Sequence, residues 1–310
     1  METRKIGSLD VSVVGLGCNN FGWRIDASAT ALVVDAALDA GITFLDTADI
    51  YGTGQSEEFL GRALRGRRSK AILATKFGSR MDEQRQGASP GYVRRAVEES
   101  LQRLGTDRID LYQLHRPDPG TPIAETLAAL DGLVKSGKVR EIGASNFSAG
   151  QIREAEAAVR DGAARFVSMQ NEYSLMHREP EKDVLPECVR GGLAFLPYFP
   201  LANGLLTGKY RPGQPLPPGS RGSDGWGPKV FGEENLQIAD RLREFAELRG
   251  HSLLELAFSW LASRPSVASV IAGAKSPEQV RSNARAAGWR LTEAELVELD
   301  KILARPLSQA

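Results

Sequence analysis

The chain has 310 residues, of which 42% are hydrophobic, and its 39 Lys and Arg residues balance 39 Asp and Glu residues. This balance favours neither nucleic acid nor an anionic membrane surface as a partner, and no segment approaches the roughly 20 apolar residues that span a bilayer. Cys18 and Cys188 are far apart, and the N-terminus leads into no apolar signal run, so we expect a cytoplasmic protein without a disulfide. The three histidines do not cluster, so no metal site is expected.

Short apolar runs alternate along the chain with segments of helical period. The runs cover residues 11–16, 43–45, 71–75, 110–114, 139–143, 166–170, 194–198 and 269–271. Until the last, they follow one another at intervals of roughly 30 residues, the length of one βαβ unit. Eight such units in one chain favour a (β/α)8 TIM barrel, and we expect a single domain over residues 1–310 with an N-terminal extension.

Helix termini are marked by capping residues. Ser89-Pro90 and Thr121-Pro122 each predict an N-cap followed by proline in the first helical position. Gly41 and Gly137 stand where a helix would end in a left-handed residue, the former after a helix over residues 32–40. Residues 200–235 are rich in Gly and Pro, so we expect a long loop there after the seventh strand.

Four polar residues follow neighbouring strands of this barrel. Asp46 follows residues 43–45, Tyr51 lies in the loop beyond it, Lys76 follows residues 71–75, and His115 follows residues 110–114. Taken singly, each has an ordinary structural explanation, as a cap, a solvated charge or a packed ring. Barrel enzymes carry their catalytic groups at the carboxyl ends of the strands, so the convergence of all four predicts an active site.

The four side chains suit carbonyl reduction. Hydride addition to a carbonyl leaves an alkoxide that must be protonated, and a phenol such as Tyr51 is a weak acid near pH 7. The Lys76 ammonium is expected to lower the pKa of Tyr51, and Asp46 to keep Lys76 charged. His115 is expected to hold the substrate oxygen or to assist proton transfer.

This ordered set resembles the catalytic tetrad of the aldo-keto reductases. The resemblance extends over nearly the whole chain, through Phe44-Leu45-Asp46-Thr47-Ala48, Tyr51-Gly52, Ser56-Glu57, Thr75-Lys76, Leu114-His115, Ile142-Gly143-Ala144-Ser145-Asn146-Phe147, Gln170-Asn171 and Gly204-Leu205-Leu206-Thr207-Gly208-Lys209-Tyr210. It implies an NAD(P)H-dependent oxidoreductase that reduces aldehydes or ketones, or catalyses the reverse reaction.

The resemblance also implies a cofactor site. Ser145, Asn146 and Gln170 would bind the nicotinamide carboxamide, Tyr198 would stack under the ring, and residues 204–209 would wrap the pyrophosphate. The full set of cofactor residues is Ser145, Asn146, Gln170, Tyr198, Leu201, Gly204, Leu205, Lys209, Gly273, Lys275, Ser276, Gln279 and Asn283.

The cofactor is expected to be NADP, with NAD as the alternative. Ser276-Pro277-Glu278-Gln279 opens a helix whose N-terminus favours a phosphate, although Ser276 and Gln279 also match a capping box. Lys275 could pair with an adenosine 2′-phosphate. Two positions depart from the family pattern. Phe199 replaces a common serine, which leaves only backbone contact with the pyrophosphate, and Gln279 replaces a common arginine.

The substrate pocket is less well marked. Trp23, Phe77, Arg116 and Trp226 are candidates for its lining, and Trp23 is equally explained as a loop-packing residue. Gly15-Leu16-Gly17 follows the first run but lacks the third glycine of a dinucleotide fingerprint. The partner is therefore expected to be a small carbonyl compound, and the sequence determines no oligomeric state.

Two other functions are compatible with the same residues. Some relatives of this type serve as cofactor-sensing regulatory subunits, and an intact tetrad does not distinguish them from enzymes. A lysine at a barrel strand end also occurs in Schiff-base lyases, where Lys76 would attack the carbonyl without a nicotinamide.

Overall fold

The apolar runs form a barrel of parallel strands in the computed structural model, which describes residues 1–223 and 230–304. The eight-stranded sheet has the order β10-β3-β4-β5-β6-β7-β8-β9. Its strands are β3 Val14–Gly17, β4 Phe44–Asp46, β5 Ile72–Phe77, β6 Ile109–Leu114, β7 Val139–Ser145, β8 Phe166–Glu172, β9 Ala194–Tyr198 and β10 Val270–Gly273. The two edges meet where the Phe195 amide donates to the Ser266 carbonyl at 2.6 Å. The predicted (β/α)8 barrel is confirmed.

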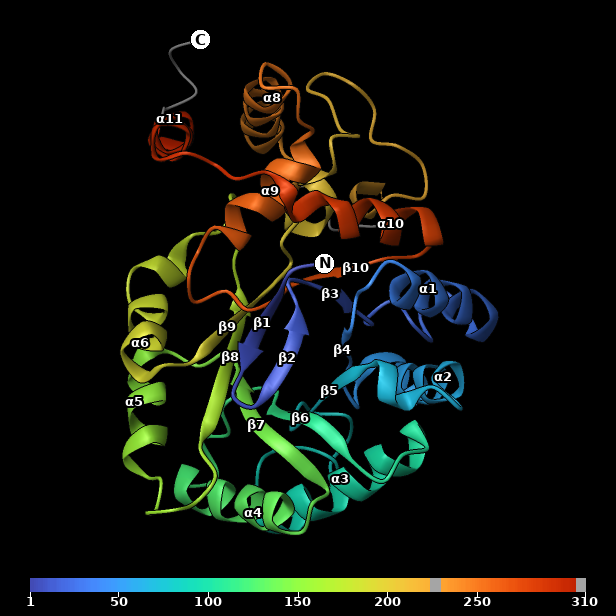
Figure 1. The fold of residues 1–310 in the computed structure, drawn as a ribbon, viewed down its shortest axis with the longest axis vertical. Coiled ribbons are helices and arrows are strands. Elements are labelled where there is room, and N and C mark those ends of the chain that lie inside the picture. Colours follow the sequence, from blue (N-terminus) through green and yellow to red (C-terminus); the bar gives the residue numbers. More distant parts are fainter. Residues whose placement is uncertain (224–229, 305–310) are drawn as a thin grey trace.

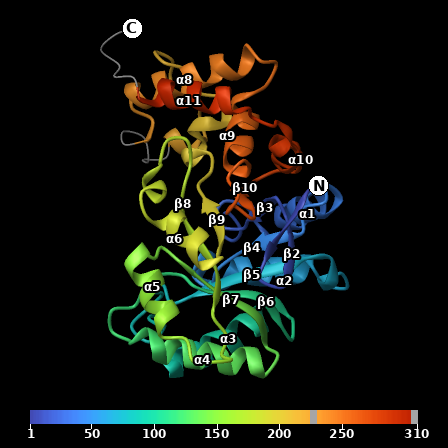
Figure 2. The ribbon, with the colours of Figure 1, turned by 60° about the vertical axis from the view of Figure 1, so that its left-hand side comes forward.

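Helices surround the strands (Figure 1). They are α1 Ala27–Asp39, α2 Gln55–Ala63, α3 Pro90–Leu104, α4 Ile123–Lys135, α5 Ala149–Ala157, α6 Val184–Gly191, α8 Glu233–Glu247, α9 Leu253–Ala262, α10 Pro277–Arg285 and α11 Glu293–Ala304. Short 3-10 helices are η1 Tyr51–Gly54, η2 Arg68–Lys70, η3 Glu179–Glu181, η4 Ala202–Thr207, η5 Arg221–Ser223 and η6 Ala286–Gly288. Figures 1 and 2 place α8 to α11 together at one end of the molecule. Within the described residues, none of the helices has the length and apolar character needed to cross a membrane.

An N-terminal hairpin closes one end of the barrel. It consists of β1 Thr3–Ile6 and β2 Leu9–Ser12, paired antiparallel. Ile6, Leu9 and Val11 pack against barrel side chains such as Phe44 and Leu111 in a cluster separate from the main core. Apolar burial therefore fills the amino-terminal end of the barrel, and the opposite end is left to carry the site.

The predicted first strand, residues 11–16, is wrong in one respect, because it joins two elements. Ser12 ends β2, and Val14 begins β3. The Ser12 hydroxyl donates to the Val14 carbonyl at 2.7 Å and accepts from the Thr43 amide at 2.9 Å. These bonds stabilise a change of chain direction inside a continuous apolar run, which hydrophobicity alone does not reveal.

The helix caps agree with the sequence in most cases. Ser89 caps α3, with Pro90 at its first position, and Gly41 and Gly137 have φ values of 79° and 75°. At α4 the prediction is displaced by one residue, since Pro122 is itself the N-cap and Thr121 donates to Asp118 instead. The first helix starts earlier than predicted, at Ala27, because the Asp26 side chain caps it.

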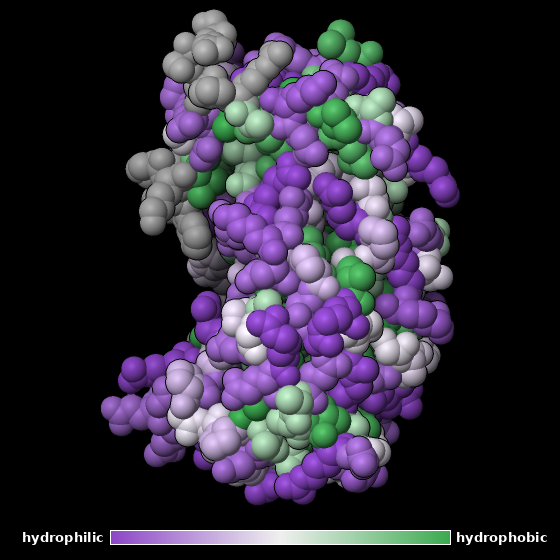
Figure 3. Space-filling view, turned by 90° about the vertical axis from the view of Figure 1, so that its left-hand side faces the viewer, coloured by the Kyte–Doolittle hydropathy of each residue, from purple (hydrophilic) through white to green (hydrophobic). Residues whose placement is uncertain are grey.

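The loop after β9 largely follows the prediction. In its described part, η4 and η5 are short, and α8 begins at Glu233, just inside the predicted loop. The loop lies at the carboxyl end of the barrel beside α9 and α10. In Figure 3 the molecular surface is mainly hydrophilic and is hollowed at the left edge of the view.

Candidate active site

The structure brings the four predicted catalytic residues together. Asp46 is the last residue of β4, and Tyr51 is the first residue of η1. Lys76 is the second-to-last residue of β5, and His115 follows β6 directly. The Lys76 Nζ atom lies 2.6 Å from Asp46 Oδ2 and 3.5 Å from the Tyr51 hydroxyl. The Tyr51 and His115 rings meet edge to face with centroids 5.8 Å apart.

Lys76 is a charged group held entirely inside the protein. Its side chain is 0% exposed, and its ammonium also donates to the Thr47 carbonyl at 3.0 Å. The second Asp46 oxygen accepts from the amides of Gln113 and Gln170, each at 3.1 Å. Burial by itself lowers the pKa of Lys76, but Asp46 and Tyr51 outweigh it and the pKa is raised. The ion pair is therefore fully satisfied, as a buried charge requires.

Tyr51 does not behave as the sequence predicted. Burial raises the pKa of Tyr51 above its ordinary value, and the Lys76 ammonium lowers it only in part because the Asp46 carboxylate acts against that charge. The predicted net lowering is wrong for this arrangement. Tyr51 is consequently protonated at neutral pH, which is the state that a proton donor needs.

His115 is a neutral imidazole at neutral pH. Burial lowers its pKa well below the ordinary value, and the charges of Lys76 and Arg116 act in the same direction. Its Nδ1 atom has no hydrogen-bond partner among the described residues. A neutral ring beside the Tyr51 hydroxyl can exchange a hydrogen bond with a substrate oxygen without adding a charge.

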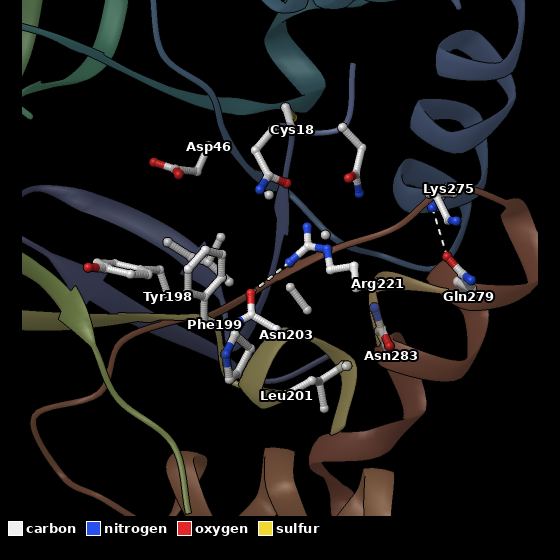
Figure 4. A pocket seen from close by; sticks show the side chains of 18 of the residues that line it. Cys18, Asp46, Tyr198, Phe199, Leu201, Asn203, Arg221, Lys275, Gln279 and Asn283 are labelled. Carbon is white, nitrogen blue, oxygen red and sulfur yellow. Dashed lines mark hydrogen bonds between the residues drawn. The ribbon is translucent and has the colours of Figure 1, made fainter. Parts of the chain in front are cut away.

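A cavity of about 640 Å³ opens above these groups. Its volume lies within the range of small-molecule and cofactor sites. Of the predicted residues, Asp46, Tyr51, His115, Arg116, Ser145, Asn146, Gln170, Tyr198, Leu201, Gly204, Lys209, Gly273, Lys275, Gln279 and Asn283 line it. Figure 4 shows Asp46 and Tyr198 toward one end and Lys275, Gln279 and Asn283 toward the other.

A hydrogen-bond network orders the end of the cavity that Asp46 and Tyr198 line. The Tyr198 hydroxyl donates to Asn146 Oδ1 at 2.8 Å, and the Ser145 hydroxyl donates to the Gln170 carbonyl at 2.7 Å. The Asn146 amide donates to the His115 carbonyl at 3.0 Å. Asn146 has a φ of 63°, a conformation that asparagine tolerates better than most residues. The network ties the loops after β6, β7 and β9 into one surface.

The loop after β9 is strained where it meets the cavity. Phe199, Ala202 and Asn203 have φ values of 52°, 44° and 58°. Such conformations in residues other than glycine cluster at functional sites. Arg221 donates to Asn203 Oδ1 at 3.1 Å and lies 5.7 Å from the centre of the Phe199 ring (Figure 4). The loop therefore presents an arginine to the middle of the cavity.

The far end of the cavity contains the start of α10. Ser276 is the N-cap and its hydroxyl accepts from the Gln279 amide. A capping box would also need the Gln279 side chain to accept from the Ser276 amide, and that bond is not formed. The Gln279 side chain accepts from the Lys275 amide at 2.8 Å. Asn283, one turn further on, is buried in the wall. The helix dipole and Lys275 make this end suitable for an anion.

Other predicted residues lie away from the cavity. Phe77 is fully buried and stacks on Tyr112 with centroids 4.7 Å apart, because alternation along β5 turns Lys76 inward and Phe77 toward the helices. Leu205 packs in the hydrophobic core, and Ser276 is the N-cap of α10 and does not line the cavity. Trp23 is 59% exposed and does not line the cavity. These placements do not support the predicted contacts, and Trp226 lies outside the described residues.

Several cavity residues have no counterpart among the sequence predictions. Arg24, Arg221 and Ser220 belong to loops without regular period, so only the fold brings them to the cavity. Asn20 lies in the loop after the first barrel strand, three residues beyond Gly17. Its Oδ1 atom and the Ser220 hydroxyl are buried in the cavity wall without hydrogen-bond partners among the described residues. Orphaned polar atoms of this kind fit the polar groups of a bound cofactor.

No group of His, Cys, Asp and Glu side chains within residues 1–223 and 230–304 could hold a metal ion. A buried acid nevertheless lies behind the tetrad. Asp49, two residues before Tyr51, has one oxygen without a partner and the other 3.5 Å from the Tyr92 hydroxyl. Burial, and then the neighbouring Glu57 carboxylate, raise the pKa of Asp49 to about 7.

Asp49→Asn is expected to stabilise the protein in a pH-dependent way. The unfolded chain loses the Asp49 proton near its ordinary pKa of 3.8 and the folded chain near about 7, so the folded state loses stability between these values. Asparagine cannot ionise. The gain in unfolding free energy over wild type should be larger at about pH 8 than at about pH 5, by about 3 kcal/mol.

Denaturant unfolding at both pH values measures the difference. The exposed substitution Asp161→Asn is the control and should change stability equally at both. An Asp49→Asn gain that does not depend on pH would show that Asp49 is ionised in the folded protein throughout this range.

The chain resembles known proteins over nearly its whole length. Residues 13–304 match the model of the Aldo/keto reductase family. The uncharacterized oxidoreductase YqkF of Bacillus subtilis is 37% identical over 96% of this chain and 95% of its own length. The aldo-keto reductase YhdN of the same organism is 35% identical, over 97% and 92%.

Similarity extends to a fungal enzyme and to a solved structure. The versiconal hemiacetal acetate reductase of Aspergillus parasiticus is 31% identical over 97% of this chain and 96% of its own length. The structure of glycerol dehydrogenase AKR11B4 from Gluconobacter oxydans superposes with a TM-score of 0.85 at 33% identity, covering 99% of this chain and 98% of that one.

Proposed function

Because this chain belongs to the aldo/keto reductase family, we propose that it interconverts aldehydes or ketones and alcohols with NAD(P)H, with Tyr51 as the general acid and base. The observation that carries the proposal is the Tyr51 hydroxyl, which lies 3.5 Å from the buried Lys76 ammonium on a residue that lines the cavity. When bound, the reduced nicotinamide supplies the hydride that goes to the carbonyl carbon.

The side chains then transfer one proton to the substrate and stabilise the charge that remains. Tyr51 donates its hydrogen to the carbonyl oxygen, which becomes the hydroxyl of the product. The phenolate that remains lies beside the Lys76 ammonium, and Asp46 keeps that ammonium charged at 2.6 Å. His115, neutral and edge-on to Tyr51, holds the substrate oxygen in line with the hydroxyl.

The cavity wall fits a nicotinamide dinucleotide. At the catalytic end, Ser145, Asn146 and Gln170 would hold the carboxamide, and the Tyr198 ring would lie under the nicotinamide. At the middle, the strained loop after β9 and Arg221 would hold the pyrophosphate. The orphaned oxygen of Asn20 and the hydroxyl of Ser220 supply further polar contacts.

Lys275 makes NADP the preferred cofactor within this proposal. It lines the cavity at the α10 N-terminus, where a 2′-phosphate would meet both its charge and the helix dipole. Gln279 is engaged by the Lys275 backbone and adds no charge. A cytoplasmic location belongs to the same proposal, because both cysteines are buried and free.

Lys275→Met is expected to weaken NADPH binding by roughly 10-fold and to leave NADH binding nearly unchanged. The reason is that only NADPH carries the phosphate that Lys275 would pair with. Titrations followed by quenching of intrinsic fluorescence give both dissociation constants. The exposed Lys182→Met serves as the control. If the affinity for NADPH and the affinity for NADH fell equally, Lys275 would not be a ligand of the 2′-phosphate.

Turnover of a panel of aldehydes with NADPH tests the function itself. Reduction of several of them supports an enzyme, whereas tight NADPH binding without any turnover would favour the cofactor-sensing subunit. A Schiff-base lyase is disfavoured already, because Lys76 is fully buried, makes three hydrogen bonds and has a raised pKa. A lysine nucleophile needs the opposite, a neutral amine open to substrate.

A further inference from the structure

The positive side chains of the cavity are unevenly placed around the barrel. Arg24 follows β3, Lys209 and Arg221 follow β9, and Lys275 follows β10. These three strands are neighbours, since β10 lies between β3 and β9 where the barrel closes. Among the described residues, the remaining cavity-lining cation is Arg116, which follows β6.

Strand β6 lies diametrically opposite β10. In the order β10-β3-β4-β5-β6-β7-β8-β9, four steps separate the two strands in either direction around the closed barrel. A dinucleotide with its phosphates among Arg24, Lys209, Arg221 and Lys275 therefore leaves Arg116 on the other side of the reacting groups. Arg116 faces the space that remains for substrate.

Arg116 stands next to the reacting groups in space as well as in sequence. It follows His115 directly and lines the same cavity as Tyr51 and Tyr198. Its charge contributes to lowering the pKa of His115, and it counteracts the rise in the pKa of Tyr198 that burial causes. The Arg116 charge thus acts on both rings, and all three side chains line the same cavity.

Within the part of the chain that the structure describes, no carboxylate forms an ion pair with Arg116, although the Glu172 carboxylate also acts on the Tyr198 ring. Asp118, two residues on, is engaged by the amides of Ala88 and Gly120 and by Thr121. Of the acids in the cavity wall, Asp46 is paired with Lys76, and Glu278 lies at the far end in α10.

From this placement we propose that Arg116 selects carbonyl substrates that carry a carboxylate. The inference rests on the proposed function and names its substrate class. The carbonyl oxygen would lie at Tyr51 and His115, and the carboxylate would meet the planar guanidinium, which matches it with two parallel hydrogen bonds. One guanidinium balances one negative charge, which suits a carboxylate better than a phosphate dianion.

The test compares 4-carboxybenzaldehyde with benzaldehyde, which differ in the anionic group. In wild-type enzyme with NADPH, kcat/KM should be at least roughly 10-fold higher for the carboxylated aldehyde. Arg116→Gln should reduce this ratio to about 1, and Arg116→Lys should give an intermediate ratio because it keeps the charge without the planar donor pair. The matched control is Arg80→Gln, an exposed arginine that follows β5 outside the cavity wall and should leave the ratio unchanged.

A binding measurement separates this inference from the proposed function. Calorimetric titration of enzyme saturated with NADP⁺ compares benzoate with benzamide, and benzoate should bind more tightly only when Arg116 is present. The role of Arg116 would be overturned if wild-type kcat/KM were about equal for the two aldehydes, or if Arg116→Gln kept the preference for 4-carboxybenzaldehyde. Either result would count even if both aldehydes are reduced. Arg116-dependent binding of benzoate without reduction of either aldehyde would uphold it and overturn the proposed function instead.

Discussion

Tyr51→Phe should lower kcat for carbonyl reduction by ~10²–10⁴ while the dissociation constant for NADPH stays within about a factor of 2. The substitution keeps the ring that packs edge-on against His115 and removes only the hydroxyl near Lys76. The loss should therefore appear in the chemical step, which single-turnover kinetics measure directly.

Tyr92→Phe provides the matched control for the removal of one hydroxyl. The Tyr92 hydroxyl lies 3.5 Å from Asp49 behind the site and outside the cavity wall, so its removal should leave kcat close to that of wild type. A Tyr51→Phe enzyme that retained wild-type kcat would show that the proton comes from another group, and the mechanism proposed for this site would fall.

Lys76→Met should reduce kcat by a similar factor and shift the pH profile of the residual activity upward. The Lys76 ammonium is the main influence that lowers the pKa of Tyr51 against the effect of burial. Without the ammonium, the phenolate that forms after proton donation loses its neighbouring charge. The expected result is a higher apparent pKa in the pH dependence of kcat, measured over the alkaline range.

Loss of Lys76 alone also leaves the Asp46 carboxylate buried without its partner, which destabilises a protein by about 3–5 kcal/mol. The double variant Lys76→Met with Asp46→Asn removes both charges and separates the two effects. We expect it to recover much of the stability of the single variant and none of its activity. Recovery of activity in the double variant would show that the ion pair serves folding alone.

The positions of Asp46, Lys76 and His115 could be predicted because each stands at the end of a recognisable strand. Once residues 43–45, 71–75 and 110–114 are accepted as parallel neighbours, the positions of Asp46, Lys76 and His115 at one end follow from strand geometry. The alternation along β5 could also have excluded Phe77, since neighbouring residues in a strand face opposite sides.

The electrostatics of the site are decided by the tertiary structure. The sequence predicted a lowered pKa for Tyr51 from its pairing with Lys76, but the outcome depends on how completely the phenol is removed from water and on the opposing Asp46 charge. Desolvation is a property of packing from many segments at once, so no local pattern contains it.

The sequence by itself determined the barrel, several of its helix caps and the polar side chains of Asp46, Lys76 and His115 at the strand ends, because periodicity and capping are local and repeat every few residues. The tertiary structure alone decided that the apolar run 11–16 splits between a hairpin and the barrel, and that Arg221 and Asn20 enter the cavity wall. It also set Arg116 across the barrel from Lys275. Such juxtapositions depend on closure of the sheet, in which residues distant along the chain become neighbours through packing rather than through any signal in their own segments.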